Sequence, residues 1–91
     1  MGILSAFLLA GTLNMTACME LASFGEAVAI DRDHGISMES EEVGVDSALL
    51  KTRQFSPMVS ALSRAIIKKI YDEEAMRSPQ QVYKDIVASC Q

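Results

Sequence analysis

Apolar and polar positions follow the period of an α-helix in four stretches of the chain, at residues 18–33, 38–51, 57–75 and 79–90. Within each stretch apolar residues recur three or four positions apart. No stretch shows the two-residue alternation that is typical of a strand. The pattern therefore predicts an all-α fold, a small four-helix domain. Its single core is expected to contain Leu21, Phe24, Val28, Leu49, Leu62, Ile66, Ile70, Val82 and Ile86.

Helix start and stop signals support these boundaries. Ser56 and Ser78 each stand directly before a proline, and a serine cap followed by a first-turn proline is a common helix start. Ser37 can cap the second helix in the same way, and Gly35 is suited to end the first. Gly44 lies inside the second helical pattern, where we expect a break or bend.

Small residues form a second lane on the first predicted helix. Ala22, Gly25 and Ala29 recur at spacings of three and four beside the larger apolar residues. Because small side chains let two helix backbones approach closely, we expect a neighbouring helix to pack against this lane.

The first 17 residues carry no charged side chain, and residues 3–13 are almost purely apolar. That run has the length of a signal-peptide core and is much shorter than the roughly 20 residues of a membrane-spanning helix. We therefore expect residues 1–17 to be an export segment and residues 18–91 to be the helical domain, located in the periplasm or secreted. The alternative is that the apolar segment forms a buried N-terminal helix.

Both cysteines lie at the ends of the charged part of the chain, Cys18 at its start and Cys90 as the penultimate residue. Export would place them in an oxidising compartment, so we expect an end-to-end disulfide between them. The alternative follows from Met15-Thr16-Ala17-Cys18, which is similar to the lipobox of bacterial lipoproteins. A lipid on Cys18 would anchor the chain to a membrane and leave Cys90 unpaired.

Residues with catalytic or ligand chemistry are sparse. His34 and the two aspartates beside it are interpreted as a solvated helix end, since metal sites need three or four convergent ligands. Arg32 is expected to act as a structural clamp, holding Asp33 or a carbonyl of a neighbouring helix. No nucleophile motif is present. We accordingly expect no enzyme activity, no cofactor and no metal.

Charge and composition limit the partners. The net charge of −4, with eight basic residues, argues against nucleic-acid binding and against adhesion to anionic lipid. Contact with a membrane is therefore expected only if Cys18 is lipidated. A protein partner of unknown identity is the remaining expectation.

Several short motifs together resemble a pattern of small exported bacterial proteins of unassigned function. They are Cys18, Arg32-Asp33-His34-Gly35, Ile70-Tyr71, Ser78-Pro79 followed by Val82-Tyr83, and Cys90. The resemblance implies a secreted or periplasmic helical domain with an end-to-end disulfide, and it implies no activity. Together with the residues, it favours a non-enzymatic interaction module.

Overall fold

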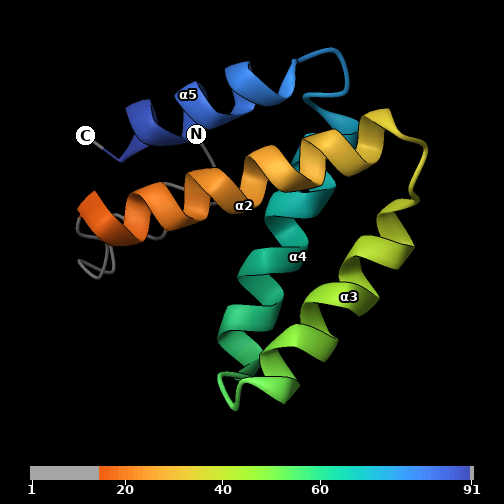
Figure 1. Ribbon diagram of the computed structural model, residues 1–91, viewed down its shortest axis with the longest axis vertical. Helices are drawn as coiled ribbons and strands as arrows, with labels where there is room; N and C mark the ends of the chain where they lie inside the picture. Colours follow the sequence, from red (N-terminus) through yellow and green to blue (C-terminus); the bar gives the residue numbers. More distant parts are fainter. Residues whose placement is uncertain (1–14, 91) are drawn as a thin grey trace.

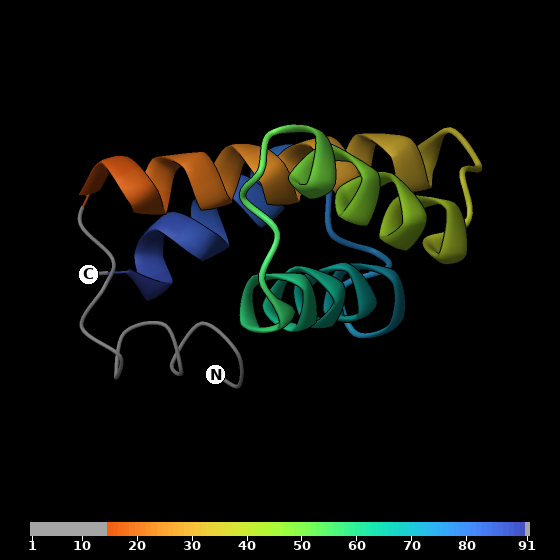
Figure 2. The same cartoon turned by 90° about the horizontal axis from the view of Figure 1, so that it is seen from below.

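The computed structural model describes residues 15–90, and this part of the chain folds into helices with no strand (Figure 1). Four helices follow one another, α2 (Met15–Asp33), α3 (Met38–Lys51), α4 (Pro57–Asp72) and α5 (Pro79–Ser89). Helix α5 runs antiparallel along α2, and α4 crosses α2, as Figures 1 and 2 show. Helices α3 and α4 form a hairpin whose end points away from α2. The prediction of an all-α, four-helix domain is confirmed. Residues 1–14 of the predicted export segment lie outside the described residues.

Serine caps begin three of these helices as the sequence predicts. The Ser37 hydroxyl accepts a hydrogen bond from the backbone N–H of Ser40, and Ser56 accepts one from Val59. At α5 the capping box is complete, because the side chains of Ser78 and Gln81 each accept from the other's backbone N–H. These bonds satisfy N–H groups that have no partner inside the helix.

Three helix features differ from the expectations. Helix α2 begins at Met15, three residues before the predicted start. Helix α4 ends at Asp72 instead of residue 75, because the N–H groups of Glu73 and Glu74 both turn back to the carbonyl of Lys69. Helix α3 continues through Gly44 without a break. A single glycine costs only about 1 kcal/mol in a helix, and the Ser37 cap with acidic residues in the first turn offsets this cost.

The core lies where α2, α4 and α5 meet. Its buried members are Ala22, Val28, Ala29, Ile66, Ile67, Ile70, Val82 and Ile86, with Leu21 and Phe24 half-buried against them. The neighbouring helix expected at the small-residue lane of α2 is α5, which approaches it at Gly25. A Cβ on Gly25 would lie 2.4 Å from Ile86 Cδ1 and 3.3 Å from Val82 Cγ1, so only glycine allows the helices this separation.

Two residues of the predicted core lie outside it. Leu49 and Leu62 are half-buried in the α3–α4 hairpin and do not join the cluster. Helix α3 packs mainly on α4, touches α2 little and has no buried residue of its own. The helical spacing of Leu49 and Leu62 is correct, but the hairpin extends beyond the core that they were expected to share.

A disulfide joins Cys18 to Cys90, with 6.2 Å between their Cα atoms. It links the start of α2 to the end of α5, which antiparallel packing brings together (Figure 1). Cys18 is 1% exposed, and half-buried Cys90 packs against the core. The predicted end-to-end disulfide is thus present in the structure.

Candidate functional site

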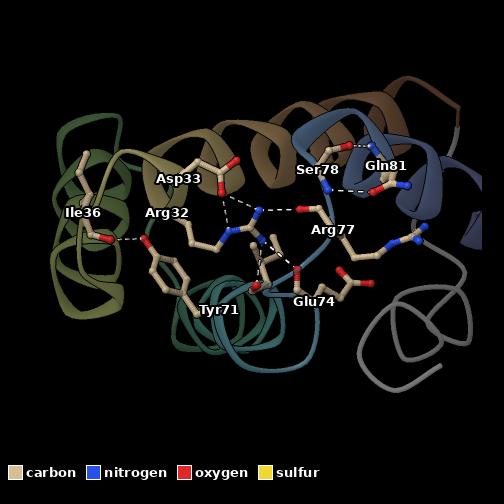
Figure 3. Close-up of polar contacts among 9 residues, drawn as sticks. Arg32, Asp33, Ile36, Tyr71, Glu74, Arg77, Ser78 and Gln81 are labelled. Carbon is tan, nitrogen blue, oxygen red and sulfur yellow. Dashed lines mark hydrogen bonds and ion pairs between the residues drawn. The ribbon is translucent and has the colours of Figure 1, made fainter.

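Arg32, at the end of α2, connects three parts of the chain through its guanidinium group (Figure 3). Its Nη1 donates to the carbonyl oxygens of Ile70 at 3.1 Å and Glu74 at 2.9 Å, and its Nη2 donates to the carbonyl of Arg77 at 2.6 Å. Nε and Nη2 also bond Asp33 Oδ1. The side chain is only 9% exposed, so the guanidinium ties α2 to the end of α4 and to the loop before α5.

Tyr71 makes a second connection at the same corner (Figure 3). Its hydroxyl donates to the carbonyl oxygen of Ile36, 2.6 Å away, in the turn between α2 and α3. Burial raises the pKa of this hydroxyl, and the nearby carboxylates of Glu41 and Asp31 raise it further. Tyr71 therefore stays a neutral donor and fixes the direction in which the chain enters α3.

A shallow groove of about 180 Å³ opens between α2 and α3. Its apolar lining comes from Phe24, Ala27 and Val28 of α2 and from Gly44, Val45 and Ala48 of α3. Because glycine and alanine form much of the α3 wall, the groove can admit the side chains of another molecule.

Two carboxyl groups line the groove, Asp31 from α2 and Glu41 from α3. The Oε1 atom of Glu41 is buried and has no hydrogen-bond partner among the described residues when both groups are ionised. Burial and, after it, the hydrogen bond and negative charge of the neighbouring Asp31 together raise the pKa of Glu41 from 4.5 to about 7. When protonated, Glu41 can donate to Asp31. The groove therefore contains a carboxyl group, that of Glu41, which either takes up a proton near neutral pH or forms an ion pair with a cation.

The middle of the α3–α4 hairpin is held by polar contacts. Asp46 accepts hydrogen bonds from Arg64 and, at 2.7 Å, from the buried hydroxyl of Ser60. Arg64 also lies 3.6 Å from Glu42. These bonds to Asp46 lower the pKa of its carboxyl group. They help to orient α3 on α4, where Leu49 and Leu62 are only half-buried.

The end of the hairpin exposes large apolar side chains. They are Leu50 at 63% exposure, Met58 at 70%, and Phe55 and Val59 at lower values. Lys51 and Arg53 stand among them, and neither forms an ion pair within residues 15–90. We call this surface, residues 50–59, the hairpin end.

Charge is divided along the chain. Residues 47–71 contain five of the eight basic residues and no acidic residue, so all 12 acidic residues lie outside this segment. Of these five basic residues, Lys51 and Arg53 lie at the hairpin end, and Arg64 pairs with Asp46 in the middle of the hairpin. Sequence reasoning based on net charge missed this division, although counting charges in segments would have revealed it.

The other candidates from the sequence lie apart. His34 is exposed in the turn after α2, and Asp33 points to Arg32. Within residues 15–90, no group of three or more histidine, cysteine, aspartate or glutamate side chains could hold a metal ion.

None of the helices in residues 15–90 is both long enough and apolar enough to cross a bilayer.

Comparisons with known proteins do not identify a family for this chain. No protein-family model, curated protein or solved structure matches the chain.

Proposed function

We propose that this chain is an exported, non-enzymatic helical module that binds a protein partner through the hairpin end. The observation that carries the proposal is the exposure of Leu50, Phe55 and Met58 together on a hairpin that extends beyond the core. Large apolar side chains gathered on one projecting surface are typical of interaction sites.

The Cys18–Cys90 disulfide supports the export part of the proposal, because such bonds persist in oxidising compartments. A lipoprotein anchored through Cys18 is the alternative. Its anchor would need the Cys18 sulfur, which in this structure is bonded to Cys90. We therefore favour the disulfide form, in the periplasm or outside the cell.

The mass of the intact protein from its native envelope or secreted fraction tests this choice. Loss of residues 1–17 together with two protons supports the proposed form. A large lipid increment on Cys18, or a reduced full-length chain in the cytosol, contradicts it.

Site-specific photocross-linking in the native cell tests the interaction surface. A photoreactive residue at position 58, on the hairpin end, is expected to give an adduct with a protein. The matched control is position 76, where Met76 is 95% exposed but lies in the loop before α5. Equal labelling from both positions, or none from position 58, would contradict the proposed surface.

A further inference from the structure

The hairpin end and the α2–α3 groove have complementary chemistry. The hairpin end carries Phe55 and Leu50 with two cations that have no ion-pair partner in residues 15–90. The groove offers an apolar wall with two carboxylates. An apolar side chain from the hairpin end would displace water from the groove, and a neighbouring cation would reach the acidic groups.

Glu41 is the residue that this complementarity explains best. Its buried Oε1 atom has no partner in residues 15–90, and the adjacent Asp31 carboxylate opposes its charge. Within an isolated chain this repulsion is relieved when Glu41 takes up a proton and donates to Asp31. A lysine or arginine from outside would supply both a hydrogen-bond donor and a compensating charge.

We propose that two copies of this chain pair, with the hairpin end of each copy in the α2–α3 groove of the other. This inference rests on the proposed function, because it names a second copy as the partner of the same surface.

A closed, two-fold pair fits the positions of the two surfaces better than an open chain of molecules. Gly44, Val45 and Ala48 line the groove, and Leu50 begins the hairpin end, so both surfaces belong to α3. Along α3, Ala48 lies two residues before Leu50 and Gly44 lies six residues before it, which is less than two helical turns. Two copies related by a two-fold axis can therefore make both contacts at once and leave neither surface free.

An anionic lipid surface is the competing occupant of the hairpin end. Only Lys51 and Arg53 lie at this end, whereas lipid-binding segments usually carry clusters of four to eight basic residues. The hairpin end also contains neither tryptophan nor tyrosine, the residues enriched at membrane interfaces. A lipid would moreover leave the groove and Glu41 unexplained.

Sedimentation velocity of the oxidised chain, from micromolar to millimolar concentration, tests the pairing. The native chain is expected to rise from its monomer mass to twice that mass and to stop there. The hairpin variant Lys51→Glu with Arg53→Asp is expected to remain monomeric. Aspartate is chosen at position 53 because Arg53 has φ of 58°, and aspartate tolerates this left-handed region.

The groove variant, Asp31→Asn with Glu41→Lys, is also expected to remain monomeric. Mixing it with the hairpin variant places opposite charges together at one contact and leaves the other contact native, so the mixture should form the pair again. Lys84→Glu, an exposed charge reversal on α5, is the control and should pair as the native chain does. Far-ultraviolet circular dichroism checks that each variant is folded.

The inference would be overturned if the native chain stays monomeric from micromolar to millimolar concentration. It would also be overturned if both charge variants still form pairs. Vesicles containing phosphatidylglycerol provide the lipid arm. The hairpin end would be assigned to lipid if the chain does not pair and if the groove variant binds these vesicles whereas the hairpin variant does not. If the chain is monomeric but position 58 still cross-links to a different protein, only the self-pairing is wrong.

Discussion

Replacing Arg32 by glutamine should cost about 2–4 kcal/mol of unfolding free energy. The guanidinium is the donor for three carbonyl oxygens, those of Ile70, Glu74 and Arg77. A hydrogen bond to a charged group contributes about 1.5–3 kcal/mol, but three bonds from one group are not additive and the Arg77 contact is exposed. Two part-buried bonds therefore set the scale. This loss is a large fraction of the 5–15 kcal/mol that stabilises most domains.

Urea denaturation followed by circular dichroism measures the effect. The midpoint should fall while the slope stays constant, because the surface exposed on unfolding does not change. Arg32→Lys should recover only part of the loss, since one ammonium group cannot reproduce the planar fork.

Arg77→Gln is the matched control. It removes an exposed ion pair with Asp85 but keeps the Arg77 carbonyl that Arg32 bonds. Such surface pairs contribute about 0.2–1 kcal/mol. If Arg32→Gln destabilises no more than Arg77→Gln, the guanidinium does not hold the corner together and this reasoning is refuted.

Three further predictions concern the Cys18–Cys90 disulfide, the two glycines Gly25 and Gly44, and the carboxyl group of Glu41. Cys90→Ser, or reduction, should lower stability by about 4 kcal/mol, because the disulfide closes a loop across 72 residues; an unchanged thermal melting curve would contradict this. In urea titrations, Gly25→Ala should destabilise the domain by about 1–2 kcal/mol, because the added Cβ would force Ile86 to move. Gly44→Ala should stabilise it by about 0.5–1 kcal/mol, because the added Cβ would enter open space and alanine favours the helix. The same sign for both substitutions would refute the close helix contact. The pKa of Glu41 is raised from 4.5 to about 7, so the folded state binds this proton more tightly than the unfolded state. The free energy of unfolding should therefore fall as the pH rises from 4.5 to about 7, by about 1 kcal/mol after solvent screening. Glu41→Gln should flatten that part of the pH profile, and an unaltered profile would exclude the proposed carboxyl pair.

Local signals in the sequence predict most of the fold. The Ser78-Pro79 start with Gln81 specifies the beginning of α5, because cap, proline and box act within four residues. The small-residue lane around Gly25 correctly indicates a close helix neighbour. The cysteines at the two ends correctly indicate the disulfide that joins them.

Features set by distant contacts are harder to predict. Arg32 bonds the carbonyl of Ile70 in the last turn of α4, although the two residues are 38 positions apart along the chain. Leu49 and Leu62 have the spacing of core residues, but spacing does not tell how far a hairpin extends beyond a core. The facing of Asp31 and Glu41 likewise depends on the angle between two helices and not on either pattern alone.

The position of the disulfide also determines how the domain responds to mechanical force. Cys18 and Cys90 lie three residues or fewer from the two ends of the described chain. A pull applied to those ends passes directly across the sulfur–sulfur bond, so α2 to α5 carry almost none of the load. The helices can then stay folded under a tension that would unravel an unlinked bundle. Reduction would restore the ordinary path of force through the core, and the same domain would become extensible.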